Sequence, residues 1–290
     1  MTTNLPFTKA QISELITTYH TPFYIYNQAG IEATTDQLYT TFKNNGFENY
    51  QNYYAVKALP NPHILKVLQA KGMGFDCSSL AELMLCEKIG AANTFLDNGL
   101  PTIIFTSNDT GAKEFQKASE VGAIINFDDI THIKFYQDNV GKLPEIGCFR
   151  YNPGPIRNFG DDNNFIIGQP QDAKYGLTKT QLFEAYKLAQ AGGSTRFGMH
   201  TMLASNELSP TAFIETTRML LELVIEIKQK LGIQLEFINI GGGMGVNYKS
   251  EQKPLDVDFI CKGIKQVYDE LEQLLEQTPP LQRGSGAYTP

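Results

Sequence analysis

From residue 52 onward, short apolar segments alternate with longer amphipathic segments, and the alternation repeats seven times. Each apolar segment has the length and composition of a buried strand, and several amphipathic segments end at a glycine, which is typical of a helix C-terminus. Strict alternation of this kind predicts parallel strands joined by helical crossovers. The predicted strands cover residues 53–58, 74–79, 102–106, 123–127, 146–151, 196–201 and 235–240.

The predicted crossover helices follow from start and stop signals. Pro62 is expected to open the first of them, and Ser209 followed by Pro210 to begin a long helix that stops at Gly232. The other helices are expected at 80–89, 112–121, from about 129, at 179–191 and at 259–274. A polar segment, 153–175, interrupts the alternation, and its length predicts a functional or mobile loop.

Residues 1–28 precede the alternation and are expected to form a separate segment of one helix and one strand. The helix should lie within residues 1–21 and be capped by Thr8, and the strand is a short β-type run at Phe23–Tyr26. A further helix is expected over Ala29–Asn45. This helix begins the main domain, which we place at residues 29–280.

Eight strand–helix units would close a barrel of roughly 250 residues, and seven are visible. The eighth strand should follow Gln277, where Thr278–Pro290 contains three prolines and two glycines and few residues that favour strands. We therefore expect an α/β fold, a TIM-like (β/α)8 barrel whose eighth strand is altered or missing. Such a barrel would leave two sheet edges unpaired. Residues 281–290 are expected to form an atypical tail.

Composition narrows the function classes. The net charge of −7 argues against nucleic acid as a partner, and no apolar run is long enough to span a bilayer. The four cysteines form no C-x-x-C pair, and no histidine lies at a spacing typical of zinc ligands, so we expect no metal site. A reducing cytoplasm with free thiols is the expected location.

Chemically useful side chains stand where the predicted strands end. They are Lys57, Asp76, Ser107, Arg150, His200 and the glycines Gly241, Gly242 and Gly243. In a barrel these ends converge on one site. A lysine there can lose its proton through burial and form an imine with a carbonyl, and a glycine turn can hold an anion on its backbone N–H groups.

Each of these residues also has a structural alternative. Lys57 can simply leave the core and reach water, Asp76 can cap the following helix, and Arg150 can pair with a nearby carboxylate. His200 can be a hydrogen-bonded core residue, or its flat ring can lie against a planar cofactor. The glycines can form a tight turn. They also partly fit a dinucleotide fingerprint, but Val246 stands where a third glycine or alanine belongs.

Six segments in order resemble the motifs of the fold-type III pyridoxal-phosphate decarboxylases, most of all the diaminopimelate decarboxylases of lysine biosynthesis. They read YYAVKALPNP, GFDCSSLAEL, RYNPG, KYGL, GMHTMLAS and NIGGGMG. The resemblance implies a barrel of the alanine racemase N-terminal type with pyridoxal 5′-phosphate as cofactor. By the same resemblance Lys57 would hold the cofactor aldehyde as an imine and His200 would stack on its ring. Ser205 and Gly241–Gly243 would hold the phosphate, and Arg150 and Asp76 would line the site.

The resemblance also has a departure. The family carries a Glu-x-Gly-Arg motif on its eighth strand, with the glutamate on the pyridine nitrogen, whereas Leu281–Ser285 contains no glutamate. The family continues into a C-terminal β-domain and forms homodimers. Because the sequence ends at Pro290, we expect a truncated member of the family. The resemblance implies an amino acid as its substrate. Three functions stay open: decarboxylation of meso-diaminopimelate, decarboxylation of ornithine, lysine, arginine or carboxynorspermidine, and an inactive cofactor-binding relative or fragment.

Overall fold

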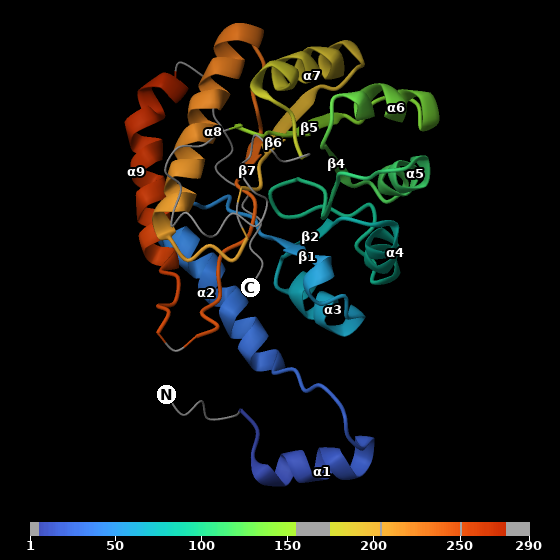
Figure 1. The fold of residues 1–290 in the computed structure, drawn as a ribbon, viewed down its shortest axis with the longest axis vertical. Coiled ribbons are helices and arrows are strands. Elements are labelled where there is room, and N and C mark those ends of the chain that lie inside the picture. The colour runs from blue at the N-terminus through green and yellow to red at the C-terminus, as the bar shows by residue number, and fades with distance from the viewer. Residues whose placement is uncertain (1–5, 155–174, 204, 250, 277–290) are drawn as a thin grey trace.

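A computed structural model describes residues 6–154, 175–203, 205–249 and 251–276. Its centre is a curled sheet of parallel strands, hydrogen-bonded in the order in which they occur along the chain (Figure 1). The strands are β1 (Tyr53–Ala55), β2 (Gly74–Cys77), β3 (Ile103–Ser107), β4 (Ile124–Phe127), β5 (Ile146–Arg150), β6 (Arg196–His200) and β7 (Phe237–Asn239). The predicted α/β barrel topology is confirmed over these seven strands.

Helices surround the sheet on its outer side (Figure 1). They are α2 (Gln28–Asn44), α3 (Pro62–Ala70), α4 (Leu80–Lys88), α5 (Ala112–Glu120), α6 (Thr131–Asn139), α7 (Lys179–Ala191), α8 (Pro210–Leu231) and α9 (Val257–Glu276). α8 packs against α9, and α2 packs against both α9 and α3. The outer ring of helices is therefore continuous from α9 through α2 to α3.

Local sequence signals explain most of these boundaries. The Asn61 side chain accepts from the backbone N–H groups of His63 and Ile64 at the start of α3, and Thr178 and Gln181 form a capping box at the start of α7. Gly232 ends α8 in the left-handed conformation, as its position predicts. Ser209 is the N-cap of α8, but its side chain makes no capping hydrogen bond, because its hydroxyl contacts Thr211 instead.

Two apolar clusters hold the layers together. The larger lies between the sheet and the helices, and the smaller contains Tyr53, Ile104, Ile124, Ile146 and Phe237. In the smaller cluster Phe237 lies so close to the backbone of β6 that a Cβ on Gly198 would be 2.1 Å from its ring. This packing fixes β6 against β7 near the site described below.

The N-terminal segment departs from the prediction. α1 (Lys9–Tyr19) carries the predicted Thr8 cap but buries none of its residues, and it lies apart from the barrel (Figure 1). Phe23–Tyr26 forms no strand, and Tyr24 is 90% exposed. Aromatic and β-branched residues favour a strand only where a neighbouring strand can pair with it. No described strand pairs with this segment.

The sheet has two edges in the part of the chain that is described. β1 pairs only with β2, and β7 only with β6. Thr278–Pro290, where the eighth strand was sought, lies outside the described residues, as does the Leu281–Ser285 stretch. Among the described helices, none combines the length and apolar character that crossing a membrane requires.

Candidate functional site

A cavity of about 380 Å³ opens where the strands end. Six of the residues predicted at strand ends line it, among them Lys57, Asp76, Arg150, His200 and Gly242, with Ser107 as the sixth. They come from the ends of β1, β2, β3, β5, β6 and β7, because parallel strands that curl bring their carboxyl ends together. The lining also includes Ser78, Thr106, Tyr175 and Met202.

His200 is buried and held by a side chain that the sequence analysis did not single out. Its Nδ1 lies 3.0 Å from Nδ2 of Asn126 on β4. The Oδ1 of the same amide accepts from the Cys148 thiol at 3.4 Å. Burial, together with the positive charge of Arg150, holds the His200 pKa well below its usual value. The imidazole is therefore neutral at physiological pH.

Arg150 pairs with Asp128, as the structural alternative predicted, and also lines the cavity. Its guanidinium lies 2.9 Å from Asp128 Oδ1 and 5.0 Å from the centre of the Tyr175 ring. Asp128 Oδ2 accepts from the Gly176 backbone N–H at 3.3 Å. One buried carboxylate thus fixes both the arginine and the backbone next to Tyr175.

Asp76 faces the cavity with an incomplete set of hydrogen bonds. Its Oδ1 is buried and has no hydrogen-bond partner among the residues that the structure describes. Burial raises the Asp76 pKa to about 7, although the charge of Lys57 and a hydrogen bond from Thr106 oppose this shift. Asp76 does not cap the next helix, because Ser79 does so by accepting from the Glu82 N–H. The unpaired oxygen marks a place for a ligand group.

Lys57 lies at the cavity mouth, not within a buried strand. β1 ends at Ala55, and Val56–Ala58 form a 3-10 turn that leaves the Lys57 side chain exposed. The predicted strand over residues 53–58 is therefore too long, and of the two alternatives for Lys57 the one in which its side chain reaches water describes its exposure. The strand ends early and Lys57 is exposed because β1 is an edge strand, with no described neighbour to cover its end.

The glycine turn after β7 approaches β6 closely. A Cβ on Gly241 would lie 2.3 Å from the Thr201 carbonyl oxygen, and φ is +80° there. The Gly241 N–H donates to Asn239 Oδ1 at 2.9 Å, whereas within the described part of the chain the Gly242 N–H reaches only the Met202 sulfur, at 3.3 Å. A thioether is a weak acceptor, so the Gly242 amide is available to a stronger one.

Three predicted residues do not line the cavity. Gly241 and Gly243 flank Gly242. Ser205 belongs to the segment after β6 that pairs with the turn, because the Glu207 N–H donates to the Gly243 carbonyl at 2.7 Å. The turn and this segment thus form one side of the site, and the role of Ser205 in holding a phosphate stays a prediction.

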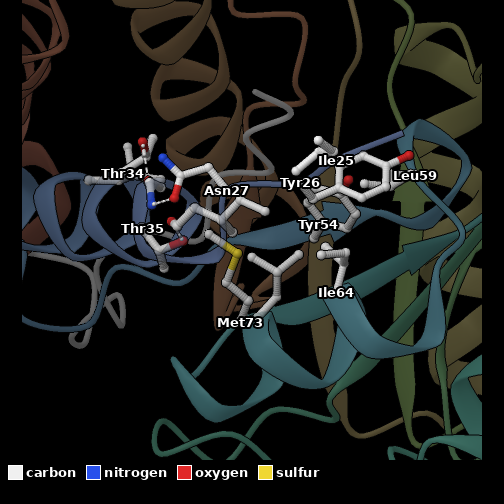
Figure 2. Close-up of a pocket in the computed structure, with 13 residues that line it drawn as sticks. Ile25, Tyr26, Asn27, Thr34, Thr35, Tyr54, Leu59, Ile64 and Met73 are labelled. Atoms are coloured by element: carbon white, nitrogen blue, oxygen red, sulfur yellow. Dashed lines mark hydrogen bonds between the residues drawn. The ribbon is translucent and has the colours of Figure 1, made fainter. Parts of the chain in front are cut away.

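A second cavity, of about 480 Å³, lies on the other side of β1 (Figure 2). Tyr54 and Leu59 line it together with residues of α2, α3 and the segment before α2, and most of its lining is apolar. Side chains on a strand alternate between faces, so Tyr54 points to this cavity while Ala55 lines the first one. Of the described residues that line the second cavity, none is a lysine, arginine, histidine, aspartate or glutamate.

The sequence analysis did not predict Asn126 and Asp128. Its criterion was a reactive side chain at a strand end, whereas these two residues act as hydrogen-bond partners of such side chains. A signal was present. Asn126 interrupts the apolar run Ile124–Phe127, and a buried amide needs hydrogen-bond partners inside the protein. Asp128 directly follows the same strand.

The lining groups fit the cofactor that the motifs imply. Lys57 offers an amine at the mouth, and His200 offers a neutral flat ring. In the ranges that the structure describes, Asp76 Oδ1 lacks a partner, and the Gly242 amide has only a sulfur as acceptor. An aromatic aldehyde with a phosphate group would satisfy each of these.

Comparison with known proteins agrees with this fit. Residues 31–286 match the family described as pyridoxal-dependent decarboxylase, pyridoxal binding domain. Protein TabA of Pseudomonas amygdali pv. tabaci is 36% identical over 282 residues, which are 96% of this chain and 61% of that protein. The diaminopimelate decarboxylase of Methanothermobacter thermautotrophicus is 27% identical, over 90% of this chain and 58% of that protein. The chain thus spans less than two thirds of the length of these relatives.

Solved structures share the fold. The diaminopimelate decarboxylase of Helicobacter pylori, complexed with L-lysine, superposes with a TM-score of 0.76 at 22% identity, over 96% of this chain and 66% of that chain. The lysine decarboxylase of Selenomonas ruminantium superposes with a TM-score of 0.72 at 20% identity, over 98% and 67%. The family match covers most of the sequence, and the curled sheet carries its motifs at the cavity. The chain belongs to the pyridoxal-dependent decarboxylases, and the curled sheet with its helices is their pyridoxal binding domain.

Proposed function

We propose that this chain binds pyridoxal phosphate in the cavity at the strand ends and takes part in the decarboxylation of an amino acid, with meso-diaminopimelate as the preferred substrate. The observation that carries the proposal is the meeting of Lys57, Asp76, Arg150, His200 and Gly242 around one cavity. They lie in or just after five different strands, and a purely structural barrel has no need of such a set.

Each residue has a role in this proposal. Lys57 supplies the amine that would bind the cofactor aldehyde covalently. The Gly242 N–H, with Gly241, Gly243 and Ser205 around it, would hold the phosphate, and the neutral His200 ring would lie against the pyridine. When bound, pyridoxal phosphate supplies the electron sink for the electron pair that remains after CO2 leaves. The protein contributes binding, orientation and exclusion of water.

Asp76 and Arg150 set the charge of the site. The Asp76 pKa of about 7 lets its Oδ1 hold or release a proton near neutral pH, beside the positive charge of Lys57. Arg150 places a fixed positive charge at the cavity, and Asp128 keeps its guanidinium in one position. A substrate carboxylate or the cofactor phosphate would be attracted by that charge.

The choice of substrate rests on the relatives and not on the cavity. Several relatives at 25–27% identity are named diaminopimelate decarboxylase. Another, at 27%, is named L-glutamyl-[BtrI acyl-carrier protein] decarboxylase, from Niallia circulans. Relatives with different names leave the substrate alternatives of the sequence analysis in place. These are ornithine, lysine, arginine or carboxynorspermidine as substrate, or a relative that binds the cofactor without turnover.

The first test is spectroscopic. Addition of pyridoxal phosphate to the purified chain should give a visible absorption band that borohydride reduction removes, and mass spectrometry should place the reduced adduct on Lys57. Lys57→Ala should abolish the band and the adduct. Lys66→Ala, a control at an exposed lysine of α3, should keep both. A chain that stays without the band, or forms the adduct equally in Lys57→Ala, would contradict the proposal.

The second test addresses turnover. Release of labelled CO2 from meso-diaminopimelate should exceed release from ornithine, lysine or arginine at equal concentration. A higher rate with one of the other amino acids would replace the preferred substrate. A visible band without CO2 from any of them would favour the inactive relative. Sedimentation at several concentrations would test the homodimer that the resemblance implies.

A further inference from the structure

We propose that Asn126 is a positioning residue for His200, which it holds in one ring orientation with the imidazole hydrogen on Nε2. This inference deepens the proposed function, because it concerns the ring against which the cofactor would lie. It assigns a role to β4, the strand from which the sequence analysis took no candidate.

Asn126 is placed for this role by the register of the sheet. It pairs with Thr106 on β3 and with Cys148 on β5, while His200 lies one strand further on. The Asn126 side chain is 2% exposed and His200 is 4% exposed, so water does not compete for their hydrogen bonds. The contact joins residues that are 74 positions apart in the sequence.

The direction of each hydrogen bond follows from Cys148. Burial raises the pKa of the Cys148 thiol far above its usual value, so the thiol keeps its hydrogen and donates it to Asn126 Oδ1. The Nδ2 group of Asn126 then faces His200. Because an amide NH2 only donates, His200 Nδ1 must accept, and a neutral imidazole must carry its hydrogen on Nε2.

A second contact fixes the same amide orientation. Asn126 Nδ2 also lies 3.4 Å from the Thr106 hydroxyl oxygen, which can accept its other hydrogen. Thr106 in turn donates to Asp76, so it presents a lone pair to Asn126. A flipped amide would set two donors against each other at Cys148 and two acceptors against each other at Thr106, whose hydroxyl hydrogen is already donated to Asp76.

The contact with Asn126 favours the neutral form of the His200 ring, and this form suits a ring that lies against the cofactor. A doubly protonated imidazole would place N–H against N–H at Asn126 and would add a positive charge beside Arg150. The neutral form presents an uncharged face to an electron-poor pyridine ring. Asn126 therefore acts through His200 and would not need to touch the cofactor.

The experiment that tests this inference is nitrogen NMR of the 15N-histidine-labelled chain without added cofactor. The chain has four histidines, and His200→Gln assigns the relevant signals by their loss. In the wild-type chain between pH 6 and 8, Nδ1 of His200 should show the chemical shift of a ring nitrogen without hydrogen, and Nε2 that of an N–H. A hydrogen on Nδ1 would overturn the inference, and this result needs no variant of Asn126.

Asn126→Asp then reverses the contact with little change of shape. A carboxylate accepts from Nδ1, so His200 should gain a hydrogen there, and the affinity for pyridoxal phosphate should fall about tenfold. Asn139→Asp makes the same change at an exposed position of α6 and should alter neither readout. Thermal unfolding checks that both variants fold, and Asn126→Ala serves if the carboxylate prevents folding.

The two proposals fail separately. Unchanged His200 signals in Asn126→Asp, or unchanged cofactor affinity in a folded variant, would overturn the role of Asn126 while leaving the cofactor site intact. A wild-type chain that binds no pyridoxal phosphate would overturn the proposed function, but the hydrogen position on His200 would still be measured in the same sample.

Discussion

The two sides of the cavity differ in how completely their polar groups are paired. On the side built by β4, β5 and β6, Arg150 has Asp128 and His200 has Asn126, which also holds Cys148. On the side built by β1 and β2, Lys57 is exposed and Asp76 Oδ1 has no partner among the described residues. One side is preorganised, while the other holds reactive groups that still lack partners.

The two sides are suited to different tasks, namely orienting a ligand and bonding to it. Groups that orient a ligand act best when their own positions are already fixed, since no reorganisation is then needed on binding. Groups that bond to the ligand must have a free atom before it arrives. The paired side should therefore contribute to folding stability, and the unpaired side should cost stability until a ligand binds.

The largest effect should come from breaking the paired side at Asp128. Asp128→Ala leaves the guanidinium of Arg150, a side chain that is only 11% exposed, without its carboxylate, and this should lower the free energy of unfolding by about 3–5 kcal/mol. Urea unfolding of the chain without cofactor measures it. Asp138→Ala removes the partner of an exposed lysine, Lys134, and should cost under about 1 kcal/mol. If Asp128→Ala and Asp138→Ala lower the free energy of unfolding equally, the paired side of the cavity does not contribute the stability expected of it.

A substitution on the unpaired side, at Asp76, should raise the stability of the chain and not lower it. The Asp76 pKa is raised from 3.8 to about 7, so the folded chain binds a proton that the unfolded chain has lost, and stability falls as pH rises from about 4 to 7. Asp76→Asn removes this titration. The variant should be more stable than wild type above pH 7, by on the order of 2 kcal/mol, and the difference should shrink toward pH 4. Urea unfolding at several pH values tests this, and a less stable variant at pH 8 would show that Asp76 is already satisfied.

The smallest effect is expected at Cys148. Cys148→Ala removes one weak donor from Asn126 and should cost about 1 kcal/mol. Its more informative readout is His200, whose nitrogen signals should broaden or double as the amide gains a second orientation. Cys148→Ser keeps a donor at this position and should retain one set of signals. A single unchanged set in the alanine variant would show that Thr106 alone orients the amide.

Sequence reasoning reached the fold because its signals are local. The helix predicted at 179–191 forms as α7 with the same limits, since a capping box starts it and glycines follow it. The predicted strands match β1 to β7 in order, although 53–58 is twice the length of β1. The prediction fails where a partner is required, as at Phe23–Tyr26, because strand propensity does not supply a neighbour.

The candidate site could be predicted in part for the same reason. Residues that end consecutive strands meet at one cavity, so topology alone brought Lys57, Asp76, Arg150, His200 and Gly242 together. Topology does not say which side chain pairs with which. The bond between Asn126 and His200 depends on the curl of the sheet and on which amide atom faces which strand, and neither is written in the local sequence.

The close approach of Gly241 to the Thr201 carbonyl bears on how this family changes over evolutionary time. Any side chain at Gly241 would push on the backbone next to His200, whether or not a phosphate is ever bound. Selection for folding alone would thus preserve this glycine in a descendant that had lost its cofactor.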